Sequence, residues 1–248
     1  GRPQMVDALK RSGAPAVGFV NCGKPDQALL APWRAAGFEL GNHQHDHADI
    51  DKTDAATWLA GVTTCTRLLE ADAPVRYFRY PYMRTGEDPA KRDAVATALT
   101  VDHGLTIGRV SVDNHEWKLG FLYGEAKKAG DEPKMARIAA AYTDHVLAAV
   151  RHYRALATDK LGRDVSHVLL LHANALLADH GADLLAALKA DGAEFVTLES
   201  ALRDPVYAMP DRYAGPGGIS WLYHVDPVTT EWSFEDAEWK RVIRPLED

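Results

Sequence analysis

Three histidines within five residues carry the strongest chemical signal in this sequence. The segment "ELGNHQHDHADI" places His43, His45 and His47 directly after a short apolar run that is predicted to be a strand. His43 and His47 stand four residues apart, so both rings can reach one ion if the segment is helical or turns tightly after the strand. Neutral imidazole nitrogens are preferred ligands of zinc and similar divalent metals. We therefore predict that His43 and His47 bind a divalent metal ion, with zinc favoured; the alternative is a solvated histidine-rich loop.

The two residues between these ligands are predicted to have other roles. His45 points away from the ion if His43 and His47 share a face, so we expect it on the surface or in a supporting role. Asp46 is likewise expected to support a ligand and not to bind the metal itself. A catalytic zinc site usually has about three protein ligands and a water. The segment therefore leaves at least one ligand to be found elsewhere.

An arginine and a proline follow another apolar run, in "FRYPY". The planar guanidinium of Arg79 can hold a carboxylate in a fixed, two-pronged geometry. Pro81 restricts the backbone and favours an extended conformation at Tyr80. A surface arginine beside a loop proline is the alternative interpretation.

Two acids and a tryptophan come together in "VDNHEW". Asp113 and Glu116 could tune a nearby arginine or histidine, and Trp117 could form an apolar wall for a sugar ring. An exposed polar turn is the alternative.

A histidine ends the fully apolar run "LLLH". His172 suits general acid or base catalysis because an unperturbed histidine titrates near 6.5. A buried structural histidine is the alternative. The glycine-rich segment "AGPGGISW", which ends at Trp221, precedes no predicted helix; it is therefore expected to shape a rim and not to bind phosphate.

Helical and strand-like segments alternate along the whole chain, and this places the polar motifs. Predicted strands cover residues 16–20, 38–40, 76–80, 105–112, 167–172 and 194–198, and predicted helices lie near residues 5–9, 27–36, 55–70, 90–99, 133–157 and 184–188. This alternation predicts a parallel sheet covered by helices, with no linker to mark a second domain. The series opens on a helix, so we expect one strand to be missing before it.

Each polar motif directly follows a predicted strand. In a parallel barrel the loops after the strands share one face, which carries the active site. The sequence therefore predicts that the four motifs converge.

Composition excludes several functions. The chain has 248 residues with a net charge of −7, which argues against nucleic acid or an anionic membrane surface as the main partner. No apolar run approaches the roughly 20 residues of a membrane span. Cys22 and Cys65 have no CxxC spacing, and we expect two free thiols, with one disulfide as the alternative. The chain opens without Met or a signal peptide, so its start does not indicate a location.

Together the four motifs resemble those of the polysaccharide deacetylase family, also called the NodB-homology or carbohydrate esterase family 4. Its HxxxH motif is similar to "HQHDH", and its RxPY motif is similar to "RYPY". Its DxxDW motif is similar to "DNHEW", with Glu116 in place of the second Asp, and its LxLH motif is similar to "LLLH". The motifs occur in the family's order within residues 16–200.

The resemblance implies an α/β fold, a distorted and incomplete (β/α) barrel of the NodB-homology type that lacks its first strand in this chain. It implies a single domain over residues 1–248, in which residues 201–248 form a C-terminal extension near the rim of the site. The family's paired Asp-Asp motif, which gives the catalytic base and the third metal ligand, has no counterpart here. We expect it upstream of Gly1.

The implied function is metal-dependent removal of acetyl groups, N-acetyl favoured, from an acetylated glycan, as a polymer or an oligosaccharide. Arg79 would orient the base and His172 would be the general acid. Asp113 and Glu116 would complete the catalytic set. The implied substrate contacts are Tyr82, Trp117, Leu171 and Trp221. The location stays unknown from the sequence, and the resemblance is compatible with an extracytoplasmic or periplasmic one.

Three alternatives remain open from the sequence. The chain could be a truncated, inactive form, or a member that binds glycans without catalysis, because the Asp-Asp motif is absent. It could also be a related C–N hydrolase that acts on a small amide or a cyclic ureide, since one fold hosts many chemistries.

Overall fold

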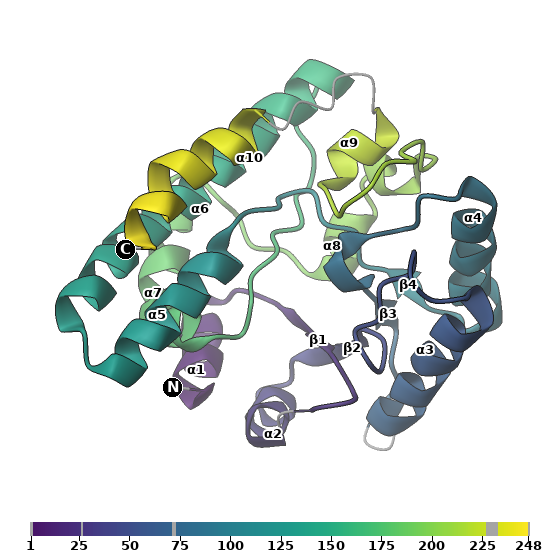
Figure 1. Cartoon of the computed structure of the whole chain (residues 1–248), viewed down its shortest axis with the longest axis horizontal. Helices are drawn as coiled ribbons and strands as arrows, with labels where there is room; N and C mark the ends of the chain where they lie inside the picture. Colours follow the sequence, from purple (N-terminus) through teal and green to yellow (C-terminus); the bar gives the residue numbers. More distant parts are fainter. Residues whose placement is uncertain (1, 26, 71–72, 227–232, 248) are drawn as a thin grey trace. The chain divides into compact units, whose positions relative to one another are not determined.

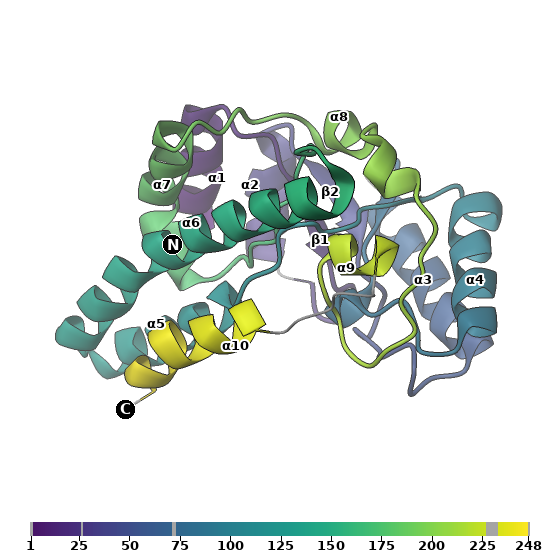
Figure 2. The same cartoon turned by 90° about the horizontal axis from the view of Figure 1, so that it is seen from above.

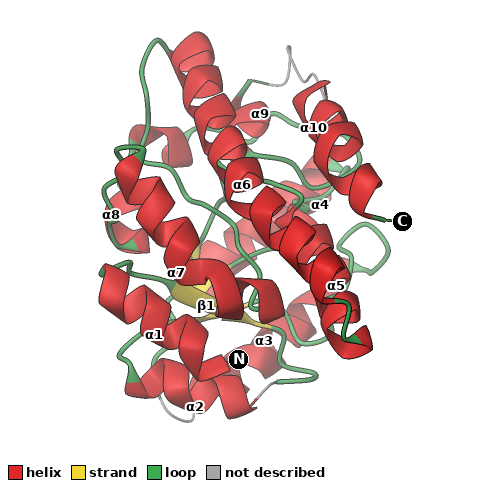
Figure 3. Ribbon diagram, turned by 90° about the vertical axis from the view of Figure 1, so that its left-hand side faces the viewer, coloured by secondary structure: helices red, strands yellow, loops and turns green. Residues whose placement is uncertain are grey.

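The computed structural model describes residues 2–25, 27–70, 73–226 and 233–247. The chain forms two compact units. We call residues 16–109 and 205–227 the sheet unit, and residues 1–15, 110–204 and 228–248 the helical unit. Helices dominate both, as the colouring by secondary structure shows (Figure 3). The prediction of a single domain stays a prediction, and the two units are described separately.

The sheet unit contains four parallel strands in the order of the chain (Figure 1). They are β1 (Val17–Val20), β2 (Glu39–Asn42), β3 (Tyr77–Phe78) and β4 (Thr106–Ile107). The helices between them are α2 (Gln27–Ala35), α3 (Ala55–Glu70) and α4 (Pro89–Thr97), with a short 3₁₀ turn over Pro81–Met83 after β3. Each crossover returns the chain to the same end of the sheet, so the residues after the strands gather at one edge.

The core of the sheet unit is formed by one face of α3. Trp58, Val62, Cys65 and Leu69 recur at spacings of four, three and four residues, and all are at most 4% exposed. The Trp58 ring stacks on Tyr80, which follows β3, with centroids 5.6 Å apart. This apolar stripe fixes α3 against the residues that follow the strands.

A disulfide joins Cys22, just after β1, to Cys65 on the buried face of α3. The two Cα atoms are 5.2 Å apart across a sequence separation of 43 residues. The expectation of two free thiols was therefore wrong. Sequence spacing did not reveal the pair because the helical face of α3 and the end of β1 approach only in the folded unit.

The helical unit contains α1 (Arg2–Ser12), α5 (Glu116–Ala129), α6 (Glu132–Leu161), α7 (Ala175–Ala190), α8 (Leu198–Leu202) and α10 (Ser233–Glu238). Helix α6 is capped at its start by Asp131, whose side chain accepts a hydrogen bond from the Lys134 backbone N–H. Gly162, in the left-handed conformation, caps its end. Its fully buried Ile138, Tyr142 and Val146 build the core against α5 and α7. Helices α5, α6 and α10 lie side by side (Figure 2).

Two predicted strands are absent as strands in the described residues. Residues 167–172 form only a single parallel bridge, between Leu169 and Val112, and residues 194–198 form none. An extended segment becomes a strand only where a neighbour supplies a ladder of hydrogen bonds, and these segments lack one here. The four other predicted strands are confirmed, β3 and β4 over two residues each. Helix α5 was missed, because the motif "VDNHEW" suggested a turn.

The remaining elements are short. Besides α9 (Trp221–Val225), a 3₁₀ turn over Pro205–Ala208 and a π-helical turn over Ala98–Asp102 lie in the sheet unit, whereas a π-helical turn over Trp239–Ile243 and a 3₁₀ turn over Arg244–Leu246 end the helical unit. None of the helices in the described part of the chain is long and apolar enough to cross a membrane.

The disulfide should contribute strongly to the stability of the sheet unit. Closing a loop of 43 residues restricts the unfolded chain, and the loop-entropy relation gives an upper value of about 4 kcal/mol. Replacing both residues, Cys22→Ser with Cys65→Ser, should lower the free energy of unfolding, measured with urea, by up to that amount. Thiol titration of the unfolded, unreduced wild type should find no free thiol; two free thiols would contradict the bond.

Candidate functional site

His43 and His47 direct the same ring nitrogen towards each other at the end of β2. Their Nε2 atoms are 3.2 Å apart, and the rings meet edge to face with centroids 4.8 Å apart. Two nitrogens bound to one tetrahedral zinc at about 2.0–2.1 Å each would be separated by about 3.3–3.4 Å. The pair therefore fits two neighbouring ligands of one metal ion.

The backbone fixes which nitrogen of His43 faces the ion. His43 Nδ1 lies 2.8 Å from the carbonyl oxygen of Arg79. A carbonyl can only accept, so Nδ1 carries the proton and the lone pair lies on Nε2. A histidine ligand whose second nitrogen donates to a carbonyl is the usual arrangement around a bound metal.

The histidines converge through a tight turn and not through a helix. Gln44 and His47 both adopt left-handed backbone conformations, with φ of 63° and 54°. Gln44 is 2% exposed, and its Oε1 accepts the backbone N–H groups of Asp46 at 2.6 Å and Ala48 at 3.1 Å. The loop thus folds around the Gln44 amide, which offsets the cost of the left-handed residues.

Helix α3 holds this loop through two side-chain hydrogen bonds. Asn42 Nδ2 donates to the Val62 carbonyl at 2.8 Å, and Trp58 Nε1 donates to the Ala48 carbonyl at 2.9 Å. A Cβ on Gly61 would lie 2.0 Å from Gln44 Nε2, so only glycine leaves room for the amide. Sequence reasoning missed Gln44 and Gly61, because neither a glutamine between histidines nor a glycine within a helix signals the other.

The residues after β1 support the loop from the other side. The His43 N–H donates to the Val20 carbonyl at 3.0 Å, and the Gly23 N–H donates to the His45 carbonyl at 2.6 Å. His45 turns away from the pair, and its Nδ1 contacts Asp46 at 2.7 Å, a carboxylate that is 71% exposed. His45 and Asp46 thus lie where a supporting or surface role was predicted.

The described residues bring together two side chains that could bind a metal, but not three. No group of three His, Cys, Asp or Glu side chains in the described part of the chain could hold a metal ion. A divalent metal therefore fits the histidine pair, with the rest of its coordination left to water, substrate or other residues.

Arg79 lies next to this pair, and its carbonyl oxygen contacts His43 Nδ1. Its Nε donates to the Gly108 carbonyl at 3.1 Å, and its guanidinium lies 4.1 Å from the Phe19 ring centroid. Within the described ranges, no carboxylate lies within hydrogen-bond distance of it. Burial lowers the pKa of Arg79 to about 9, so it remains charged at neutral pH. This charge is available to a carboxylate.

Tyr82 forms an exposed rim beside the histidines. Its ring centroid lies 4.4 Å from that of His47, and 55% of the residue is exposed. Tyr82 and Met83 both have φ of 56°, a strained conformation for side-chain-bearing residues. A Cβ on Gly218 would lie 1.5 Å from the Tyr82 carbonyl oxygen, so the segment "AGPGGISW" packs against this turn, consistent with the predicted rim.

Trp221 is placed differently from what was expected. It is 2% exposed, and its Nε1 donates to the Val206 carbonyl at 2.7 Å. One face carries the Arg109 guanidinium, with Cζ 3.6 Å from the ring centroid. This burial does not support the predicted contact between Trp221 and a substrate.

In the helical unit, His172 is oriented by a buried carboxylate. Its Nδ1 and its backbone N–H both contact Glu116 Oε1, at 2.7 and 2.6 Å. Glu116 is 1% exposed, whereas the His172 side chain is 48% exposed. With Nδ1 donating to the carboxylate, Nε2 is the nitrogen that is left to exchange a proton with a substrate. His172 is therefore not the buried structural histidine of the alternative interpretation.

Glu116 is itself held at the start of α5. Its backbone N–H donates to Asn114 Oδ1 at 2.9 Å, and Asn174 Nδ2 lies 3.4 Å from its Oε2. A Cβ on Gly120 would lie 2.0 Å from Asn174 Nδ2, so this glycine makes room for the amide. The first turn of a helix favours a carboxylate. Glu116 can thus take the part of the Asp that it replaces.

Three other predicted site residues belong to the helical unit: Asp113, Trp117 and Leu171. Burial raises the pKa of Asp113 to about 7, while the Asn114 N–H lowers it and the charge of Glu235 raises it. Asp113 can therefore hold a proton near neutral pH. Trp117 is 47% exposed, in keeping with a surface for a substrate, and Leu171 is partly buried against the core of the helical unit.

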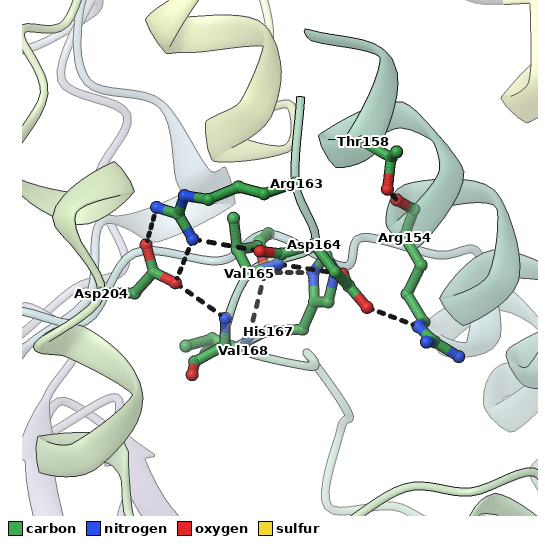
Figure 4. Close-up of polar contacts among 10 residues, drawn as sticks. Arg154, Thr158, Arg163, Asp164, Val165, His167, Val168 and Asp204 are labelled. Atoms are coloured by element: carbon green, nitrogen blue, oxygen red, sulfur yellow. Dashed lines mark hydrogen bonds and ion pairs between the residues drawn. The ribbon is translucent and has the colours of Figure 1, made fainter. Parts of the chain in front are cut away.

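A polar cluster around His167 in the helical unit is structural. Ser111 Oγ lies 3.1 Å from His167 Nδ1. His167 Nε2 lies 3.0 Å from Asp164 (Figure 4). These are the residue types of a serine hydrolase. Ser111, however, is fully buried and accepts the Val168 N–H at 2.9 Å, so it cannot reach a substrate.

The remaining contacts in Figure 4 tie this cluster to neighbouring helices. Arg154 of α6 donates to Asp164 at 2.9 Å, and Arg163 pairs with Asp204, after α8, at 2.6 Å. The network therefore fixes the segment between α6 and the extended residues 167–172.

Comparison with known proteins agrees with this geometry. The model of the polysaccharide deacetylase family matches residues 1–106. The comparison with curated proteins gives no match.

Solved structures with the same fold include a family 4 carbohydrate esterase pseudoenzyme from Bacillus anthracis, at 16% identity and a TM-score of 0.54. They also include the Bc1960 peptidoglycan N-acetylglucosamine deacetylase, at 17% and 0.54, and a family 4 carbohydrate esterase from Streptomyces lividans in complex with acetate, at 18% and 0.51. Each alignment covers 81% of this chain. It covers 60%, 80% and 88% of the three structures in turn, so the chain spans about three fifths of the pseudoenzyme.

The resemblance inferred from the motifs is confirmed. Residues 1–106 match the polysaccharide deacetylase family, and the chain has, in part, the NodB-type (β/α) fold of carbohydrate esterase family 4.

Removing the paired histidines should remove metal binding. His43→Ala with His47→Ala takes away both converging nitrogens, so zinc retained after dialysis, measured by elemental analysis, should fall to background. His45→Ala is the matched control from the same loop and should keep the wild-type zinc content. Equal stoichiometry in the double variant and the wild type would rule the site out.

The glycine beneath the loop gives a second test of the same geometry. Gly61→Ala places a methyl group where Gln44 Nε2 lies and should displace the loop without changing a ligand. We expect zinc affinity, measured by competition with a chromophoric chelator, to fall at least about tenfold. Gly124→Ala, in α5, where a Cβ would meet open space, should leave the affinity unchanged. An unchanged affinity in Gly61→Ala would show that the amide does not position the histidines.

Proposed function

We propose that this protein is a metal-dependent hydrolase that removes acetyl groups, N-acetyl favoured, from a carbohydrate polymer or oligosaccharide. The observation that carries the proposal is the pair of Nε2 atoms of His43 and His47, 3.2 Å apart. The proton of His43 is fixed on the far nitrogen by the Arg79 carbonyl. Among the similar structures is one described as a peptidoglycan N-acetylglucosamine deacetylase, which supports a glycan substrate.

The chain's own residues would divide the work of amide hydrolysis. His172, oriented by Glu116, would deliver a proton to the leaving nitrogen, because an amine leaves poorly as its anion. Arg79 would keep a carboxylate base ionised through its buried positive charge. Tyr82 and Trp117 would offer exposed aromatic rings to a sugar. A bound divalent metal would supply Lewis-acid activation of water and of the acetyl carbonyl.

A non-catalytic, glycan-binding role is the second candidate. Two observations favour it: the described residues offer no third metal ligand, and a structure of similar fold is described as a pseudoenzyme. A metal assay does not separate the two candidates, because both predict an occupied histidine pair. Release of acetate from N-acetylated chito-oligosaccharides by the zinc-loaded full-length protein would establish the enzyme. Binding without release would establish the binding protein, and release of ammonia from a small amide would indicate a different C–N hydrolase.

The variant that tests the catalytic proposal is His172→Ala. Positioned proton transfer contributes about 10²–10⁴-fold to a rate, so kcat of the full-length protein for deacetylation should fall at least about 10²-fold with zinc content unchanged. His172→Gln should be no better, because an amide fills the space but cannot deliver a proton.

His103→Ala is a suitable control, because His103 has no part in either motif, and its kcat should match the wild type. Near-native turnover in His172→Ala or His172→Gln would assign the proton donor to another group.

A further inference from the structure

Alternate residues of the loop after β2 contact the turn that carries Tyr82. The His47 and Tyr82 rings meet edge to face, with centroids 4.4 Å apart. Two residues further along each segment, Asp49 Oδ2 contacts Arg84 Nη1 at 2.5 Å. The two segments are therefore joined first by a pair of rings and then by an ion pair.

The carboxylate of Asp49 is oriented through both of its oxygens. Oδ2 contacts Arg84, while Oδ1 accepts the backbone N–H of Asp51 at 3.0 Å. The Asp49 side chain is 12% exposed and that of Arg84 is 30% exposed. An ion pair with this little access to water is held more firmly than an exposed one. A second cation, Lys52, lies 3.8 Å from the same Oδ2, but its side chain is 80% exposed.

This ion pair acts on a strained turn. Tyr82 and Met83 both have φ of 56°, a conformation that persists only where the surrounding structure enforces it. Within the turn, the Arg84 backbone N–H donates to the Pro81 carbonyl at 3.1 Å. The Arg84 guanidinium then leaves the turn to reach Asp49, with its Cζ 6.0 Å from the Tyr82 ring centroid. Arg84 thus connects the end of the strained turn to the loop of the histidine pair.

A backbone contact beyond the ion pair holds the rest of the segment. The Glu87 N–H donates to Asp51 Oδ1 at 2.8 Å. This bond involves no side-chain atom of Asp49 or Arg84, so it should survive the loss of the Asp49 charge. Removal of that charge should therefore release the Tyr82 turn without unfolding the segment.

We propose that Asp49 is a positioning residue that, through Arg84, holds the Tyr82 ring where the acetylated sugar would stack. This role rests on the proposed glycan substrate, because Tyr82 is 55% exposed beside His47. A ring that is already held in place loses less conformational freedom on binding a sugar than a ring that must first be ordered. Asp49 therefore acts on the affinity for the sugar, and not on metal binding or on proton transfer.

Kinetics of the zinc-loaded full-length protein on N-acetylated chito-oligosaccharides test this role. Asp49→Asn keeps an oxygen for the Asp51 N–H but removes the charge that holds Arg84. KM should rise at least about fivefold, while kcat changes by less than about twofold and zinc content stays the same. Asp49→Glu, which keeps the carboxylate, should recover most of the lost affinity. If the protein binds glycans without hydrolysis, the dissociation constant of the same oligosaccharide replaces KM.

Lys52→Met is the matched control, because it removes the other cation near Asp49, and its KM should equal that of the wild type. An unchanged KM in Asp49→Asn overturns the proposal. So does a KM in Lys52→Met that rises as much as in Asp49→Asn.

A double variant tests whether Asp49 acts through the Tyr82 ring. Tyr82→Ala removes the ring, so adding Asp49→Asn to Tyr82→Ala should raise KM no further. A further rise would show that Asp49 reaches the substrate by another route, and the proposal would be wrong.

A measurement without substrate separates this role from the proposed function. The nuclear Overhauser effect between the ring protons of His47 and Tyr82 should be present in the wild type and lost in Asp49→Asn. Lys52→Met should retain it. An undiminished effect in Asp49→Asn overturns the positioning role, whatever the substrate is. If the effect is lost but the wild type neither hydrolyses nor binds the oligosaccharides, the proposed function is rejected, while the positioning of Tyr82 by Asp49 is supported.

Discussion

The histidine pair depends on the buried amide of Gln44. Its carbonyl oxygen accepts two backbone N–H groups of the loop, those of Asp46 and Ala48. Two left-handed residues cost roughly 1–2 kcal/mol each, and hydrogen bonds formed away from water can offset a cost of this size. The amide in turn requires the bare surface of α3 at Gly61. The packing of the loop against α3 through Gln44 and Gly61 therefore keeps the two imidazole rings convergent.

His43 and His172 each donate a hydrogen bond from Nδ1 and leave Nε2 available, but the two acceptors differ. His43 donates to a neutral backbone carbonyl, whereas His172 donates to the carboxylate of Glu116. A carbonyl fixes the tautomer without adding charge, which suits a ligand that must stay neutral. A carboxylate stabilises an imidazolium, which suits a group that carries a proton and delivers it. The same hydrogen bond from Nδ1 would therefore suit His43 for metal binding and His172 for proton transfer.

The sequence predicted most of the elements and motif residues, but not the groups that position them. The alternation of helices and apolar runs predicted β1 to β4 and the helices α2, α3 and α4, because the periodicity of burial is local; α9, which follows "AGPGGIS", was not predicted. The disulfide, the support of Gln44 by Gly61 and the burial of Trp221 were not predictable, because each depends on a contact between distant segments. The start of α5 was missed because Glu116 belongs to a polar motif, and its carboxylate points back towards His172 instead of to solvent.

The close approach of Gly218 to the Tyr82 carbonyl has a consequence for how this protein can diversify. The Tyr82 carbonyl occupies the space that a Cβ on Gly218 would need, so position 218 cannot take a larger residue unless the strained turn at Tyr82 and Met83 moves with it. A mutational library that varies Gly218 would lose most of its members to misfolding unless the turn varies with it. The two segments can therefore diverge only as a pair at this point of contact.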